Sequence, residues 1–491
     1  MKSCFPRRWL AYMAGIGLRL FLPLCEELLE RAGDKIEAFT LVIGDLSWYR
    51  WASIHAKHPT LRLIYQHEQL NPFGKQAPAD QARLNDYETR YGLPHLWRYI
   101  LSHRMVDRLS YNRKIAYLQA YISYFENLAV NYQPEVFLSA APDSLLFMVG
   151  FRVMQVNGAV PLLLGPSRFP GRTFIVDNET EQIPGLEAAY AALKQRPLIQ
   201  AESDQALKLV DAYRVKRLRP PYFGIGPRLR YFPSIPRFVW LVKKWFMGDD
   251  RYFEMSVLQA AVQSAKTRFK TPWQARQLVK LSSATSAGEP YFYYPLHYEP
   301  ESTVDVFSTF WRDQLFLIKW VAAALPANFW LYVKENPNMA IGTRPWGFYK
   351  QIASIPGVRL CATGMNSYEI IEKCRGVVTL AGTTGLEALM LGKPVLIIGH
   401  AFYEIFSEGV FRTDGSSESV VEALQRMASM EKVDEGALLR FIAASLQRSS
   451  SAELEQCRPE VEEPQNISHL ADDVLKELSL RLSESGILVE A

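Results

Sequence analysis

Residues Val377–Gly399 read VVTLAGTTGLEALMLGKPVLIIG, which is an apolar run, a glycine-rich turn, a helical pattern and a second apolar run. The pattern predicts a buried strand over Val377–Leu380, a helix from Thr384 and a strand over Val395–Ile398. A helix that starts directly after a strand points backbone N–H groups and its positive dipole end forward, and a phosphate usually occupies that place. The stretch therefore predicts an α/β fold with a phosphate site at this turn.

Five residues of this turn are candidate ligands for a nucleotide. Gly382 and Gly385 are expected to let a ligand approach the backbone closely. Thr383 and Thr384 add hydroxyl donors, and Glu387, expected in the first helical turn, would accept from a ribose or sugar hydroxyl. A glycine-rich turn alone is a weak signal, but GTTGLEA followed by GKP is specific.

A second polar cluster, KENP, directly follows the strand predicted over Phe329–Val333. Lys334 would neutralise a phosphate, and Asn336 would hydrogen-bond the phosphate or the base. The alternative interpretation is a strand-end turn with a surface ion pair.

The third cluster lies in YPLHYEPE, after the strand predicted over Tyr291–Tyr294. His297, Glu299 and Glu301 supply a titratable donor and two carboxylates, which is what acid or base assistance requires. Each of them could equally be a loop residue satisfied by the backbone.

The first half of the chain alternates short apolar runs with helical patterns, which is typical of a doubly wound parallel sheet. Strands are predicted over Ala38–Ile43, Pro134–Ala140 and Val160–Leu164. Ligands bind outside the carboxyl ends of such strands, so Asp143 and the loop Gly165–Arg172 are candidates for the acceptor side. An ordinary turn carboxylate and a proline- and glycine-rich loop are the alternatives.

In the second half, a helix predicted over Asp313–Leu325 places four residues on its inner face: Leu315, Ile318, Ala322 and Leu325.

The chain has 491 residues, more than one core usually supports, and so predicts two domains. The expected divisions are 1–213, a basic and aromatic linker region over 214–285, a second domain over 286–430 and a helical tail over 431–491. Within the linker, 214–244 has many cations and no acids, and could contact anionic lipid headgroups or an anionic acceptor, or be a solvated connector.

Charge and cysteine content exclude several classes of protein. With 55 basic and 51 acidic residues the chain lacks the large positive net charge of a dedicated nucleic-acid-binding protein, so no nucleic-acid partner is expected. Five scattered cysteines without a C-x-x-C pair argue against a disulfide framework and a zinc site, and fit a reducing cytoplasm. The apolar start of the chain is interrupted by Arg19, which favours a soluble first element over a signal peptide or a surface-lying amphipathic segment.

Taken together, PLHYEPES, KENP, SYEII, GTTGLEALMLGKPVLIIG and HAFYE, between Tyr291 and Tyr403, resemble the capsule polysaccharide biosynthesis family, which includes bacterial Kdo transferases. The resemblance implies a GT-B fold, in which two Rossmann-like domains face each other across a cleft. It also implies metal-independent transfer from a nucleotide-sugar such as CMP-Kdo, with no other cofactor. It adds Ser367 of SYEII to the donor-binding residues and places a catalytic acid on a loop of the first domain, where Asp143 fits best.

One residue departs from the family pattern. The family generally has K-E-H-P, whereas this chain has Asn336, which can donate a hydrogen bond but cannot carry a charge. The resemblance as a whole implies a cytoplasmic glycosyltransferase that can lie peripherally on the inner face of the cytoplasmic membrane and acts on a glycan or lipid-linked acceptor. Two alternatives stay open: another GT-B chemistry, such as an epimerase or a polyol-phosphate transferase, and a binding or export-coupling protein without catalysis.

Overall fold

The computed structural model describes residues 5–66, 80–92, 96–107, 109–218, 251–252, 255–283, 288–339, 341–454 and 459–484. It divides the chain into two compact units, which are described separately. Unit 1 contains Met1–Leu186 and Leu446–Ala491, and unit 2 contains Glu187–Ser445.

Unit 1 is built on a six-stranded sheet in the order β3-β2-β1-β4-β5-β6, parallel except for β6. Its strands are β1 (Arg8–Met13), β2 (Ala38–Ile43), β3 (Leu61–Tyr65), β4 (Val136–Ala140), β5 (Val160–Pro166) and β6 (Thr173–Val176). Its helices are α1 (Leu18–Ala32), α2 (Leu46–His55), α4 (Gln81–Arg90), α5 (Leu96–Ser102), α6 (Arg104–Asp107), α7 (Tyr111–Tyr132), α8 (Leu145–Val156) and α20 (Pro464–Glu484).

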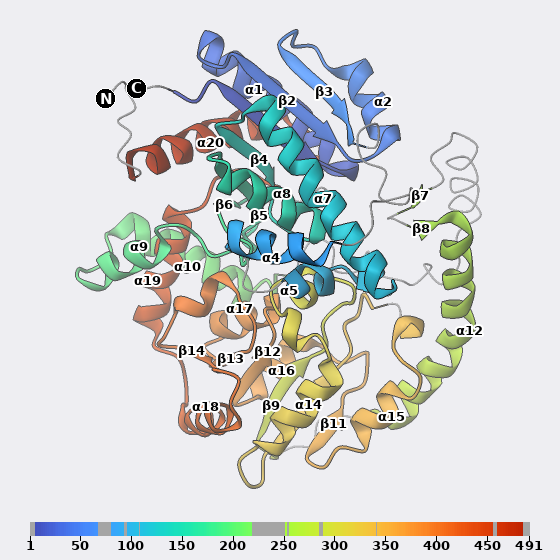
Figure 1. The fold of residues 1–491 in the computed structure, drawn as a ribbon. Coiled ribbons are helices and arrows are strands. Elements are labelled where there is room, and N and C mark those ends of the chain that lie inside the picture. Colours follow the sequence, from blue (N-terminus) through green and yellow to red (C-terminus); the bar gives the residue numbers. More distant parts are fainter. Residues whose placement is uncertain are drawn as a thin grey trace. The chain divides into compact units, whose positions relative to one another are not determined.

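The predicted strands of the first half are present, and β2 has the predicted bounds. The apolar start of the chain forms β1, a strand that sequence analysis did not identify and that lies in the middle of the sheet. One face of the sheet packs against α1 and α20, which lie side by side in Figure 1 although they stand at opposite ends of the chain. The predicted tail, 431–491, is thus divided: its last part, with α20, belongs to unit 1, and residues 431–445 belong to unit 2.

Unit 2 has a second six-stranded sheet in the order β11-β10-β9-β12-β13-β14, in which all strands are parallel. Its strands are β9 (Tyr291–Pro295), β10 (Trp330–Lys334), β11 (Val358–Leu360), β12 (Gly376–Thr379), β13 (Val395–Ile397) and β14 (Val410–Arg412). A short pair, β7 (Arg251–Tyr252) and β8 (Met255–Ser256), precedes it. Its helices are α9 (Leu186–Lys194), α10 (Gln200–Arg214), α12 (Val257–Leu281), α13 (Ser302–Asp305), α14 (Gln314–Ala323), α15 (Phe348–Ala353), α16 (Ser367–Lys373), α17 (Thr383–Met390), α18 (Ser417–Ser429) and α19 (Glu435–Gln447).

Numbered from the first strand of each unit, both sheets have the order 3-2-1-4-5-6, which is the order of the Rossmann fold. The predicted class, α/β with two Rossmann-like domains, is confirmed. In unit 2 the chain switches direction between β9 and β12, so the loops after these two strands meet at the carboxyl edge of the sheet.

Several expected boundaries and faces differ from the structure. The chain divides after Leu186 and Ser445, not after 213 and 430, and 257–281 forms the long helix α12 of unit 2. The basic and aromatic segment 214–244 lies outside the described residues from position 219 onward. The fully buried residues of α14 are Gln314, Leu317, Ile318 and Val321, of which the prediction named only Ile318. The other three predicted residues, Leu315, Ala322 and Leu325, are partly buried and pack against the same core.

None of the helices in the described part of the chain combines the length and the apolar content needed to cross a bilayer.

Candidate functional site

His297 joins the loop after β9 to the end of β12. Its side chain is only 6% exposed. The backbone N–H of Leu380 donates to His297 Nε2 at 3.2 Å, and Thr379 Oγ1 lies 3.1 Å from the same nitrogen. Because Nε2 accepts from a backbone N–H, the proton of the neutral ring belongs on Nδ1. The imidazole therefore fixes the turn that precedes α17.

The two glycines of the turn are needed for packing against protein. A Cβ on Gly382 would lie 2.7 Å from His297 Cε1, and a Cβ on Gly385 would collide with the hydroxyl of Tyr403. Tyr403 in turn donates from its hydroxyl to the carbonyl of Gly382 at 2.7 Å. Gly382 has an ordinary φ of −77°, so its backbone conformation does not require glycine. Both glycines therefore make room for His297 and Tyr403, and their predicted role in admitting a ligand stays a prediction.

The first residues of α17 carry the predicted phosphate-binding groups. The helix begins at Thr383, one residue earlier than predicted, after the N-cap Gly382. Within the described residues, no side chain caps this end and its first turn contains no acid. The N–H groups of Thr383 and Thr384 and the positive end of the helix dipole are thus directed to the carboxyl edge of the sheet.

Two of the other predicted donor-binding residues, Lys334 and Ser367, are in contact beside this edge. Lys334 ends β10, is 3% exposed, and donates from Nζ to Ser367 Oγ at 3.3 Å, at the start of α16. Tyr293 of β9 hydrogen-bonds the same serine. Burial raises the pKa of Tyr293 above its ordinary value, and the nearby Glu387 carboxylate also raises it, so the phenol keeps its proton.

Glu387 is placed differently from the prediction. It lies beyond the first turn of α17, and it is 8% exposed. Its charge raises the pKa of the buried phenol of Tyr293, and this phenol hydrogen-bonds Ser367, the partner of Lys334. We call these four residues, together with Thr383 and Thr384, the edge cluster.

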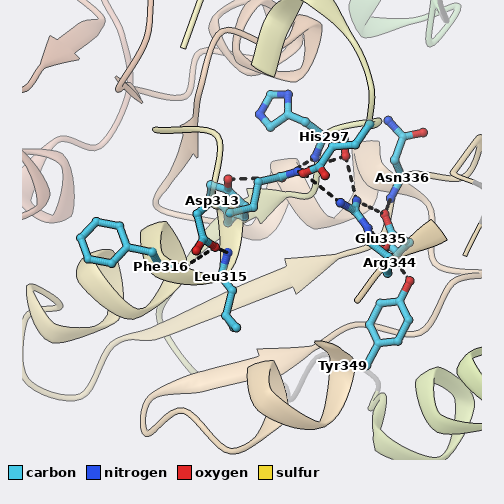
Figure 2. A network of polar contacts seen from close by, with 11 residues as sticks. His297, Asp313, Leu315, Phe316, Glu335, Asn336, Arg344 and Tyr349 are labelled. Atoms are coloured by element: carbon cyan, nitrogen blue, oxygen red, sulfur yellow. Dashed lines mark hydrogen bonds and ion pairs between the residues drawn. The ribbon is translucent and has the colours of Figure 1, made fainter. Parts of the chain in front are cut away.

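Arg344, which sequence analysis missed, is the centre of a buried polar network (Figure 2). Its side chain is 1% exposed and forms two bonds with Glu335, Nε to Oε2 at 2.9 Å and Nη2 to Oε1 at 2.8 Å. Tyr349 donates its hydroxyl to Glu335 Oε2 at 2.7 Å. Burial alone would lower the pKa of Arg344, but the carboxylates of Glu335 and Glu299 raise it above its ordinary value. The predicted alternative, a surface ion pair within KENP, is wrong because Glu335 pairs inward with Arg344.

The same network holds the loop that carries the predicted acid and base residues. Arg344 Nη2 donates to the carbonyl of His297 at 2.8 Å, and Nη1 lies 3.1 Å from Glu299 Oε1. Gln314, at the start of α14, accepts from His297 N–H at 2.8 Å and donates to Glu299. Figure 2 shows the His297 ring pointing away from Arg344. The ring contacts Leu380, directly after β12. Glu301 is the N-cap residue of α13.

Asn336 follows Glu335 at the end of β10. Its Oδ1 accepts from the N–H of Asn338 at 2.9 Å, which leaves Nδ2 as its hydrogen-bond donor. In Figure 2 the amide points away from the Arg344 network. The side chain can therefore donate one hydrogen bond at this position, but it brings no charge.

Asp143 lies in unit 1, after β4, and is not part of the edge cluster. Its carboxyl keeps solvent contact, yet the surrounding protein raises its pKa, while Ser144 and His103 act in the opposite direction. Glu181 is also nearby: burial raises its pKa, Arg168 lowers it and Asp143 raises it further. Arg168 Nη2 lies 3.5 Å from Glu181 Oε2.

Glu181 is a further residue that sequence analysis did not single out, whereas its partner Arg168 belongs to the predicted loop Gly165–Arg172. Both have positive φ, 54° and 65° respectively, a conformation that is uncommon outside glycine and costs free energy. A Cβ on Gly165 would lie 3.8 Å from Glu181 Oε1 and 3.3 Å from Ala141 Cβ, which places this carboxylate at the carboxyl ends of β4 and β5. The sequence offers no local signal for this pair, because residues 168 and 181 are brought together by the strand β6.

The fold and the sites define a two-unit α/β protein with Rossmann-like sheets and a polar cluster at the switch point of the second sheet. Residues 251–445 match the model of a family described as capsule polysaccharide biosynthesis protein. The matched segment makes up most of unit 2. No curated protein matches the chain.

Several solved structures are similar along most of the chain. The β-Kdo 2,7 transferase KpsC of Thermosulfurimonas dismutans is 16% identical, with 78% of this chain and 97% of that chain covered and a TM-score of 0.38. The UDP-GlcNAc 2-epimerase of Methanocaldococcus jannaschii, in complex with UDP-GlcNAc and UDP, is 9% identical, with 89% and 99% covered and a TM-score of 0.30. CalG4, the calicheamicin glycosyltransferase, is 12% identical, with 96% and 99% covered and a TM-score of 0.27. Similarity at this level carries no conclusion about activity.

Proposed function

We propose that this protein is a glycosyltransferase of capsular or surface polysaccharide biosynthesis that takes its sugar from a nucleotide donor. The edge cluster of unit 2 is the observation that carries the proposal. It combines the start of α17, the buried cation Lys334 and the hydroxyl of Ser367 at the switch point of a parallel sheet. The match of residues 251–445 to the capsule family model supports the same conclusion.

The donor phosphate would bind at the N–H groups of Thr383 and Thr384. An anion at a helix N-terminus gains about 0.3–1 kcal/mol at an exposed site and up to roughly 2 kcal/mol when partly buried. Lys334 would add a charge-assisted contact, worth about 1.5–3 kcal/mol. Asn336 Nδ2 would donate to the phosphate or the base, and Glu387 would accept from a sugar or ribose hydroxyl.

His297 supports this site by holding the turn before α17, so we propose for it a positioning role. Glu299 and Glu301 stay candidates for acid or base assistance on the same loop. Asp143, on the loop after β4 of unit 1, is a further candidate for this role, as the family resemblance implies.

The finer assignments follow the family resemblance. We propose CMP-Kdo as the donor, a glycan or lipid-linked acceptor, transfer without a metal ion, and a cytoplasmic enzyme that can contact the membrane through 214–244. Within the described residues no group of three or more histidine, cysteine or acidic side chains could hold a metal ion. This finding does not test the transfer reaction itself, so metal independence stays part of the proposal.

A second candidate function, nucleotide-sugar binding without transfer, is favoured by one observation. Asn336 stands where the family generally has histidine, so the charge that an imidazolium would bring to the departing phosphate is missing. The two candidates differ in turnover: the binding protein would hold the donor but release no free nucleotide when acceptor is added.

The proposal is tested by thermal unfolding of the full chain with CMP, UDP, GDP and CDP. A ligand that binds the folded state raises the melting temperature by mass action, and CMP should raise it most. Lys334→Ala and Glu387→Ala should each weaken nucleotide binding, about tenfold or more for the lysine. Lys350→Ala, an exposed lysine of α15, is the matched control and should bind as the wild type does. Unchanged affinity in both cluster variants would remove the donor-site assignment.

A further inference from the structure

One face of α12 packs firmly on unit 2 and fixes the orientation of the helix. Thr271, Gln274 and Leu278 are buried on this face. Gln274 Nε2 donates to the carbonyls of Arg344 at 2.9 Å and Pro345 at 2.7 Å. Figure 1 shows α12 running beside α15. The opposite face of the helix is therefore turned away from the packed side.

That opposite face carries a regular stripe of exposed side chains. Successive members are spaced four or three residues apart, which places them on one side of a helix with 3.6 residues per turn. Phe269, in the middle, is 85% exposed. We call this set the α12 stripe: Val262, Lys266, Phe269, Trp273, Arg276 and Lys280.

A second element widens the aromatic part of the stripe. Trp346, just before α15, is 61% exposed, and its ring centroid lies 4.7 Å from that of Trp273 in an edge-on arrangement. Lys270 Nζ lies 5.4 Å from the centroid of Trp346. Three large aromatic side chains thus form one exposed surface with cations beside them.

The charge of α12 complements an anionic surface. The helix contains five basic residues and no acidic one, although the whole chain is nearly balanced with 55 basic and 51 acidic residues. Aromatic rings at the centre and cations toward both ends of a stripe are suited to the headgroup region of a bilayer, where rings enter the interface and cations meet lipid phosphates. Such a surface is unfavourable in water, because so much aromatic area stays hydrated.

We propose that the α12 stripe docks this protein on an anionic lipid bilayer, with the axis of α12 parallel to the membrane. Phe269, Trp273 and Trp346 enter the interface, and Lys266, Arg276 and Lys280 pair with lipid phosphates. This surface is separate from segment 214–244, and the inference does not depend on the donor sugar or on catalysis.

The test is co-sedimentation of the full chain with vesicles of phosphatidylcholine alone and of equimolar phosphatidylcholine and phosphatidylglycerol. We expect binding to the anionic vesicles only, and weaker binding as salt is added. Phe269→Ser with Trp273→Ser should lower the partition coefficient at least tenfold. Lys266→Gln with Arg276→Gln should lower it about twenty-five-fold, since each cation near an anionic surface contributes roughly 1 kcal/mol, which is a factor of about five.

Matched controls lie on α14 of the same unit. Phe316→Ser and Lys319→Gln remove an exposed aromatic and an exposed cation outside the stripe, and should leave vesicle binding unchanged. All variants should keep the thermal unfolding profile of the wild type, because the changed side chains are exposed. Three results would overturn the proposal: no binding of the wild type to anionic vesicles, equal binding by the stripe variants, or binding of single-stranded RNA but not of vesicles.

Discussion

Replacing Arg344 by methionine is expected to destabilise unit 2 strongly. The guanidinium is 1% exposed and contacts two carboxylates, and the side chain of Glu335 is only 2% exposed. Arg344→Met would leave Glu335 with the donors of Tyr349 and the Asn336 N–H, but with its charge uncompensated. The same change would release the carbonyl of His297 and so loosen the loop after β9.

The size of the effect follows from burial. Breaking a buried ion pair by removing one partner costs about 3–5 kcal/mol, because the remaining charge stays out of water. For a unit of this size each kcal/mol shifts the melting temperature by about 2–4 °C, so we expect a fall of roughly 10 °C. Arg344→Lys keeps the charge but loses the two-pronged contact with Glu335, and should give an intermediate loss.

Urea unfolding and calorimetry of the full chain would measure this loss, with Arg359→Met as the control. Arg359 also pairs with a glutamate, Glu289, at 2.6 Å, but the two side chains are 27% and 30% exposed. An exposed pair contributes about 0–1 kcal/mol, so the control should lose much less. The reasoning is refuted if Arg344→Met and Arg359→Met lose the same free energy, or if Arg344→Met unfolds like the wild type.

Two further predictions concern the turn before α17 and the carboxylate of unit 1. Tyr403→Phe removes the hydrogen bond to the Gly382 carbonyl. It should cost about 1 kcal/mol of stability, measured by urea unfolding, and weaken nucleotide binding several-fold, measured by titration calorimetry. Unchanged values in both assays would contradict the role given to Tyr403. The pKa of Glu181 is raised in the folded chain above the ordinary value of 4.5. The folded chain therefore binds this proton more tightly than the unfolded chain does, and the free energy of unfolding falls as pH rises from 4.5 through the raised pKa. Glu181→Gln should therefore flatten the fall of unfolding free energy with rising pH over that window, and an equally steep fall in the variant would show that the slope comes from other groups.

Local patterns in the sequence predict much of unit 2. The stretch Val377–Gly399 gives the strands β12 and β13 and the start of α17 within one residue, because apolar runs, glycine and proline act over short distances. The structure also brings Lys334 and Ser367 into contact, and the nucleotide site to which both were assigned stays a prediction. Parallel strands end at one edge, so residues that follow neighbouring strands meet there.

The reasons for the two glycines could not be predicted in the same way. Gly382 and Gly385 signal close approach in the sequence, but not what approaches. The structure shows that His297 and Tyr403, which are distant along the chain, fill the space. Only packing decides whether a glycine faces a ligand or another side chain.

The sequence by itself determined the class of fold and the type of most elements, because hydrophobic periodicity is a property of neighbouring residues. The tertiary structure alone decided three features: the pairing of Arg344 with Glu335 and Glu299, the strand order 3-2-1-4-5-6, and the packing of α20 on α1 at the other end of the chain. Each depends on contacts between segments far apart in sequence. Such contacts leave no periodic signal, and they form because burying charge requires a partner and burying an apolar helix face requires a neighbour.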